Sequence, residues 1–206
     1  MSSLIYTADS LTATPTVGAT EFDGKALYAT PQGTQRGIIP VAQFFRLNAD
    51  LVGTNVATAQ STFGVGVTLS SSTVYVFEGV YLLSKTAGAT AHTLGTGFGG
   101  AATITQIAYT ALGYIAAANP LASTLAQSLI ATSATATAVT GSVASATSYA
   151  TVIVKGTVSI NAGGTFTPQY ILSAAPGGAY STLAGSYFSI HPVGTSGANT
   201  SVGAWA

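Results

Sequence analysis

The chain has no cysteine at any of its 206 positions. Disulfides, thiolate nucleophiles and cysteine-held metals are therefore excluded. Charge is almost as scarce, because charged residues make up 5% of the chain, against about 25% in ordinary globular proteins. Five scattered cations cannot form the basic surface that a nucleic acid requires, so we expect no nucleic-acid partner. The positive mean hydropathy, +0.50, excludes a charge-driven disordered chain.

Long apolar runs are also missing. The richest one, residues 74–83, is shorter than the about 18 residues that a membrane-spanning helix needs, and it contains Glu78. Residues 1–5 have neither the basic part nor the long apolar part of a signal peptide. We therefore expect a soluble protein without a membrane partner, assembled in the cytoplasm of the cell that makes it.

Small and hydroxyl-bearing residues take the place of charge. Alanine, threonine, glycine and serine fill 113 of the 206 positions. Hydroxyls hydrate the outer face of a strand without charge, and threonine favours strands. A surface of this kind, or one that is largely covered in an assembly, fits a structural protein better than an enzyme.

The few charges are concentrated toward the N-terminus, where seven of the ten lie within the first fifty residues. Residues 1–39 have no clear periodicity and contain prolines and an Asp-Gly turn at 23–24. We predict an extended N-terminal arm over 1–39 with a small hairpin at 21–28; a frayed terminus is the alternative. Apolar residues within the arm favour docking to a partner. The candidate docking residues are Glu21, Phe22, Asp23, Lys25, Tyr28 and Arg36.

From residue 40 onward the pattern is that of strands separated by Gly, Ser and Pro turns. The strand-like segments are 41–47, 63–69, 73–84, 103–115, 149–160, 166–172 and 186–193. Many short strands of this kind predict an all-β fold, an antiparallel β-sandwich or jelly roll over 40–206. One segment departs from the pattern. Asn119-Pro120 followed by leucines at 121, 125 and 129 predicts a helix over 120–131, with a loop inside 116–148 as the alternative.

Residues suited to catalysis or metal binding are few and dispersed. Acid–base chemistry needs paired carboxylates or a histidine near a nucleophile, but Glu78 is the one acid after residue 50, and neither His92 nor His191 lies in a motif. Glycines 95, 97 and 100 have the spacing of a dinucleotide motif, but no acid follows them, so we predict a glycine-rich turn at 90–97 and beyond. We expect no enzymatic activity, no cofactor and no metal; three copies of His191 around a threefold axis are the one metal alternative.

Two charges stand inside otherwise uncharged strand segments, Glu78 and Lys155. Because a lone buried charge is too costly, each must reach a partner or water. They could form an ion pair across neighbouring strands, or each side chain could point outward to water from its own strand. The alternative is that they lie at a subunit interface and fix its register.

The last predicted strand is apolar on both faces apart from Ser189 and His191. A strand that is covered on one face would alternate cleanly, so the second face calls for a partner. A closed symmetric assembly supplies this partner and hides strand edges. We predict a homotrimer with Tyr187, Phe188, Ile190 and His191 at its interface, which the change Phe188→Asp should disrupt.

Several stretches resemble small virion proteins of tailed bacteriophages. They are EFDGKALYATP at 21–31, RGIIP at 36–40, KGTVSINAGGTFTPQ at 155–169 and GSYFSIHPVG at 185–194. The C-terminal pattern also resembles the final strands of trimeric jelly rolls of the tumour-necrosis-factor and C1q type. The resemblance implies a protein of the outer virion surface, assembled in the host cytoplasm. It would be a capsid decoration (cement) protein bound to the major capsid protein or another virion protein, or alternatively a head or tail fibre that contacts host glycans.

Overall fold

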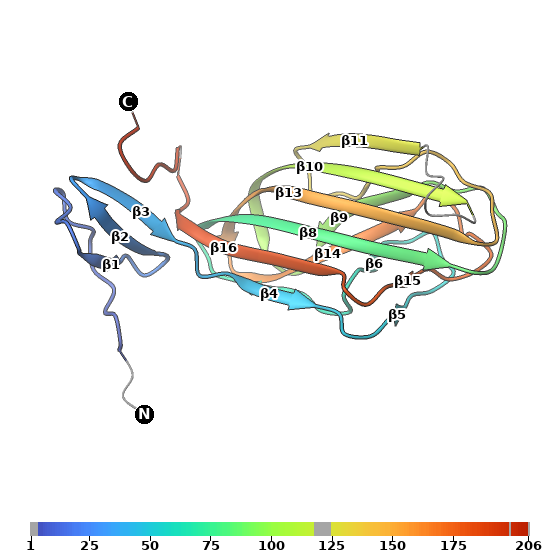
Figure 1. Ribbon diagram of the computed structural model, residues 1–206, viewed down its shortest axis with the longest axis horizontal. Coiled ribbons are helices and arrows are strands. Elements are labelled where there is room, and N and C mark those ends of the chain that lie inside the picture. Colours follow the sequence, from blue (N-terminus) through green and yellow to red (C-terminus); the bar gives the residue numbers. More distant parts are fainter. Residues whose placement is uncertain (1–3, 118–124, 198, 206) are drawn as a thin grey trace.

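Strands form all the regular structure of the part of the chain that the computed structural model describes, residues 4–117, 125–197 and 199–205. Two antiparallel sheets are stacked into a sandwich, and a third, smaller sheet projects from one end of it (Figure 1). The predicted all-β sandwich is confirmed.

The small sheet follows the stretch 4–19, which has no strand. Its order is β1-β2-β3, and its strands are β1 (Thr20–Phe22), β2 (Leu27–Gln32) and β3 (Gln35–Ile39). The hairpin predicted from the Asp-Gly pair is present, with Glu21 opposite Tyr28 and Gly24 at a φ of 84° in the turn. Glycine suits this turn because it adopts a positive φ without steric penalty.

The large sheet has the order β11-β10-β13-β8. Beyond β8, its first part pairs with β16 and its last part with β15; β16 then pairs with β4, and β15 with β5. The strands are β4 (Gln43–Arg46), β5 (Leu51–Val52), β8 (Thr73–Lys85), β10 (Thr103–Ala117), β11 (Leu125–Ala131), β13 (Ser148–Ala162), β15 (Ser181–Thr182) and β16 (Tyr187–Thr195).

The second sheet lies behind the large one in Figure 1. Its order is β12-β9-β14-β6, and β7 also pairs with β14. The strands are β6 (Gln60–Ser61), β7 (Val67–Leu69), β9 (Leu94–Gly99), β12 (Thr137–Ala138) and β14 (Gly164–Leu172).

The core lies between the two sheets and is rich in aromatic rings. Phe77 of β8 meets Phe98 of β9 at 4.9 Å between ring centroids, and Phe98 stacks on Phe166 of β14 at 4.6 Å. The alternation predicted for 149–160 is confirmed, since Val152, Val154, Val158 and Ile160 are all fully buried. Strict alternation is what a sheet with one core-facing side requires.

The helix predicted over 120–131 is wrong for 125–131, which form β11; residues 118–124 lie outside the described part. β11 runs antiparallel to β10, with Leu125 opposite Ile115 and Leu129 opposite Ala111. Leucines four apart share a helix face, but four is also an even number, so they share one face of a strand as well. Pairing along the edge of a 15-residue strand decided between the two.

The glycine-rich turn predicted at 90–97 is wrong for 94–97, which belong to β9. These glycines serve close packing rather than a turn. A Cβ on Gly95 would lie 2.5 Å from the Thr137 carbonyl oxygen, and one on Gly97 would lie 2.5 Å from Cα of Ala136. Glycine in a strand often marks such a close approach of backbone. Gly100, at a φ of 112°, does turn the chain after β9.

Candidate docking surfaces

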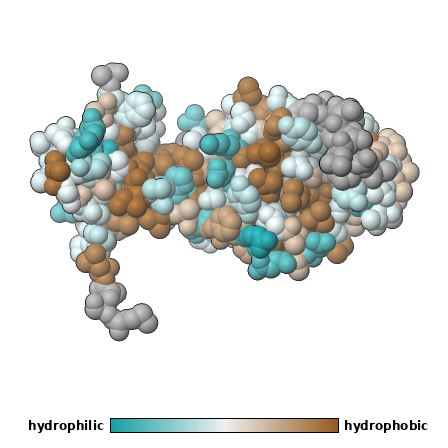
Figure 2. Space-filling view, in the orientation of Figure 1, coloured by the Kyte–Doolittle hydropathy of each residue, from teal (hydrophilic) through white to brown (hydrophobic). Residues whose placement is uncertain are grey.

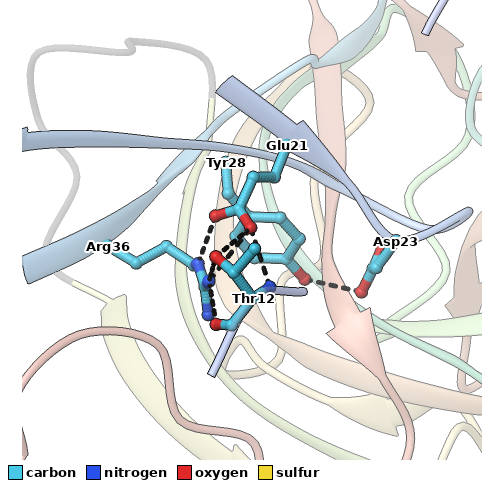
Figure 3. Close-up of polar contacts among 5 residues, drawn as sticks. All are labelled: Thr12, Glu21, Asp23, Tyr28 and Arg36. Atoms are coloured by element: carbon cyan, nitrogen blue, oxygen red, sulfur yellow. Dashed lines mark hydrogen bonds and ion pairs between the residues drawn. The ribbon is translucent and has the colours of Figure 1, made fainter. Parts of the chain in front are cut away.

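A polar cluster joins the stretch before β1 to strands β1 and β3 of the small sheet (Figure 3). The Arg36 guanidinium donates to both Glu21 carboxylate oxygens, from Nε at 2.8 Å and from Nη2 at 3.1 Å. The same Nη2 donates to the Thr12 carbonyl oxygen at 2.7 Å. The Thr12 amide and hydroxyl in turn donate to Oε1 of Glu21 at 2.9 and 2.8 Å. Two-point contact of this kind is the strongest geometry for an arginine–carboxylate pair.

This cluster changes the acidity of Glu21. The hydrogen bond from the Thr12 backbone amide, followed by those from Arg36 and the Thr12 hydroxyl, lowers the pKa of Glu21 to about 2. Glu21 is therefore ionised throughout the ordinary pH range and holds the stretch before β1 against the sheet.

Asp23 organises the hairpin turn. Its Oδ1 accepts hydrogen bonds from the amides of Lys25 and Ala26, both at 2.8 Å, which is the local bonding that makes aspartate a turn residue. Its Oδ2 accepts a hydrogen bond from the Tyr28 hydroxyl at 2.9 Å. Tyr28 is buried, and burial together with the neighbouring carboxylate raises the pKa of Tyr28 well above its usual range.

The small sheet also contacts the sandwich. Lys25 Nζ donates to the Ser71 carbonyl oxygen at 2.9 Å, and a Cβ on Gly194 would lie 3.1 Å from the Tyr28 hydroxyl.

The residues predicted for docking are placed as follows. The structure brings Glu21 and Arg36 together, joins Asp23 to Tyr28, and turns Lys25 toward the sandwich, while Phe22 is half-buried in β1. The polar groups that the sequence singles out for docking bond within the chain. Glu21 and Arg36 reach each other from β1 and β3, the two outer strands of the small sheet. Opposite charges on the first and third of three short strand segments were the signal that could have revealed this pair.

Apolar side chains remain exposed around this sheet. Leu4 and Ile5 are 79% and 81% exposed, and Val17 and Ile39 are also exposed. Figure 2 shows brown, hydrophobic surface along the join between the small sheet and the sandwich. A partner of this region would therefore meet apolar contacts.

The residues predicted for a trimer interface divide between two faces of β16. Phe188 and Ile190 are buried in the protomer's own core, where Phe188 stacks on Phe77 at 5.7 Å. Tyr187 and His191 point to the opposite, outer face of the large sheet and are half-buried. Of these four residues, Tyr187 and His191 are therefore the two whose side chains lie on the outer face. The change Phe188→Asp would unfold the protomer rather than report on assembly.

An apolar groove lies where β4 ends the large sheet. Its cavity has a volume of about 200 Å³. It is lined by Phe44, Phe45, Phe63, Val65, Phe188 and Ile190, among others. Phe44 is 61% exposed and stacks on Tyr187, with ring centroids 5.6 Å apart.

Glu78 and Lys155 lie directly opposite one another on neighbouring strands β8 and β13. Both are exposed on the outer face of the large sheet, which confirms that they point outward. Within the described part of the chain, the ion pair that forms is Arg36–Glu21, and none joins Glu78 to Lys155.

Residue types suited to catalysis meet at one end of the sandwich, but they are buried. Lys85 is 2% exposed, and its ammonium donates to the carbonyl oxygens of four loop residues, Ala87, Gly88, Ser145 and Ala146. The ring of Tyr180 lies 5.9 Å from this ammonium. The cluster joins the loops that follow β8 and precede β13.

His92 extends this buried cluster. Its Nδ1 lies 2.7 Å from the Thr90 carbonyl oxygen, so Nδ1 carries the proton, and Nε2 accepts from the Tyr180 hydroxyl at 2.8 Å. Burial lowers the pKa of His92 and raises the pKa of Tyr180 to about 12. The bonds described for these side chains are internal, so they stabilise the loops.

Among the described residues, no three His, Asp or Glu side chains come together as metal ligands would. Within the same ranges there is no helix with the length and apolarity to cross a membrane.

Comparison with known proteins does not identify a family for this chain. No protein-family model matches the chain, and no curated protein matches it. Among solved structures, a chain from the structure of infectious bursal disease virus Gt strain aligns with 79% of this chain at 8% identity and a TM-score of 0.15. The alignment spans 43% of that viral chain. A likeness this low carries no argument about fold or function.

Proposed function

We propose that this protein is a non-enzymatic structural protein of a tailed-phage virion, a capsid decoration protein that stabilises the head. In this proposal, residues 1–39 dock on capsid subunits at the outer surface of the particle, and the sandwich faces outward. The sequence stretches that resemble phage virion proteins support it, as does the scarcity of charge on a hydroxyl-rich β surface.

One observation carries the proposal: a small sheet with its own polar network projects from the sandwich and is flanked by exposed apolar side chains (Figures 1 and 3). Scattered exposed apolar residues are ordinary, but Leu4 and Ile5 lie together on a strandless stretch. A stretch without strands has no core of its own, so these two side chains would become buried only against a partner. The charged residues then position the docking region, and the apolar residues make the contact.

The test is binding to purified phage heads that lack this protein. The double variant Leu4→Asp/Ile5→Asp should lose most co-sedimentation with heads, because each aspartate would have to be desolvated at the contact. The matched control is Val52→Asp, a valine on β5 of the sandwich that is 70% exposed, which should bind like wild type. If the double variant binds heads as well as the Val52→Asp control does, docking through the N-terminal region is refuted.

A fibre or receptor-binding protein is the second candidate. The exposed aromatic residues Phe44 and Tyr114 on the sandwich favour it, because aromatic rings pack on sugar faces. The number of copies per virion separates the two roles. Hundreds of copies indicate decoration, whereas a few indicate a fibre.

A further inference from the structure

The central strand of the large sheet is apolar on both of its faces. Its inward residues fill the core, and its outward residues include Val74, Val76, Val80 and Leu82, all half-buried. An antiparallel sheet with one wet face alternates between apolar and polar residues, whereas a near-continuous apolar strand is typical of a sheet that is covered on both sides. The outer face of β8 therefore has the composition of a covered surface.

Neighbouring strands extend this surface in register. Val80 lies opposite Ile153 of β13 on one side and Tyr187 of β16 on the other, and Ile153 lies opposite Leu112 of β10. Ile153 is 42% exposed. Figure 2 shows hydrophobic surface over this part of the sandwich, crossed by a few hydrophilic side chains. Leu112, Ile153, Val80 and Tyr187 thus form one row across four strands, which we call the outer apolar row.

Glu78 and Lys155 lie next to this row. The row beside it runs from Thr110 through Lys155 and Glu78 to Ser189. The face thus presents one acid and one base at its centre, without an ion pair between them among the described residues. Arg46 of β4, opposite Tyr187, adds a second cation at the edge of this face. Any second copy presents the same acid and base at its centre, so the centre of the surface is complementary to itself. The zero net charge of the chain adds no long-range repulsion between copies.

We propose that the outer face of the large sheet is the contact between copies of this chain, with Glu78 of one copy paired with Lys155 of the next and the outer apolar row packed beside them. Tyr187 and His191 belong to the same face. The inference rests on the self-association predicted from the sequence, and it identifies the surface responsible. A second copy is favoured over another protein because the two central charges complement each other.

The test reverses each charge separately. Glu78→Lys makes the centre of the face wholly positive, and Lys155→Glu makes it wholly negative. Both side chains are exposed in the protomer, so either change leaves the core intact, which circular dichroism checks. Like charges across an interface cost several kcal/mol, so each variant should raise the apparent dissociation constant of the assembly at least about tenfold. The matched control is Thr68→Lys, which adds one charge at an exposed position on β7 of the other sheet.

Mixing provides the decisive readout. An equimolar mixture of the two variants should recover association in light scattering, through complexes that contain both variants, because a positive centre then meets a negative one. Pairing within one chain cannot produce this result, because each chain in the mixture carries charges of a single sign at 78 and 155.

Each outcome is informative. If Glu78→Lys and Lys155→Glu both assemble as well as wild type does, the contact lies elsewhere and this inference is wrong, while self-association stands. A wild-type monomer at micromolar concentration would overturn both the inference and the self-association predicted from the sequence. Docking on heads is read independently from co-sedimentation of the Leu4→Asp/Ile5→Asp variant.

Discussion

Lys85 offers the sharpest test of how this protein holds its loops, because it is a buried cation that pairs with no carboxylate in the part of the chain that the structure describes. Its ammonium lies 2.5 Å from the Gly88 carbonyl oxygen and 3.2 Å from those of Ala87 and Ala146, and it also bonds Ser145. The change Lys85→Met keeps the aliphatic stem and removes all the donors.

The magnitude follows from these contacts. The ammonium has three protons, and hydrogen bonds to a charged group contribute about 1.5–3 kcal/mol each, so the gross loss is roughly 4.5–9 kcal/mol. Burying the ammonium costs several kcal/mol, which the variant no longer incurs. We therefore expect the free energy of unfolding to fall by about 2–4 kcal/mol. For a chain of this size the Tm changes by about 2–4 °C per kcal/mol, so it should fall by roughly 4–16 °C.

The assay is denaturant and thermal unfolding at one protein concentration, followed by circular dichroism. The matched control is Lys25→Met, because Lys25 donates to a single carbonyl, that of Ser71, at the surface. The control should lose at most about 1 kcal/mol, because an exposed charged side chain exchanges its contact for water at little cost. If the two variants prove equally stable, the four-carbonyl cage contributes nothing net, and the reasoning on Lys85 fails.

Three further predictions concern other parts of the fold. The stabilisation due to ionised Glu21 is complete above the ordinary glutamate pKa of 4.5. It is lost as the pH falls from 4.5 to about 2, because the carboxyl of the unfolded chain takes up its proton first. Glu21→Gln should abolish this part of the acid dependence in a pH series of unfolding curves. Phe188→Ala should lower the free energy of unfolding by about 3–5 kcal/mol, because Phe188 is 4% exposed. Phe44→Ala should lower it less, because Phe44 is largely exposed. Chemical denaturation measures both, and equal losses would contradict the placement of Phe188 in the core and of Phe44 at the surface. Gly113→Ala should lower the Tm, because the new Cβ would lie 2.1 Å from the Val139 carbonyl oxygen; an unchanged Tm would show that the chain near Val139 moves aside without cost.

The β class and most of the long strands could be predicted from the sequence. Alternation in 149–160 placed Val152 and Val154 in the core, because a strand with one core-facing side has a period of two. It also identified the outward charges Glu78 and Lys155, because a lone charge does not stay in an apolar core. The hairpin at 21–28 followed from its Asp-Gly turn, a purely local signal.

Tertiary structure alone decided what depends on neighbours distant in the chain. Residues 125–131 became a strand because β10 supplied a free edge, and glycines 95 and 97 entered a strand because the chain around Thr137 approaches them closely. Lys85 is buried because carbonyls from two separate loops converge on its ammonium. Two of the charged residues predicted for docking, Arg36 and Glu21, bond one another for the same reason, since the sheet order places β1 and β3 on either side of β2. Local pattern fixes the period of each strand, whereas only the assembled sheets determine which side chains and edges meet.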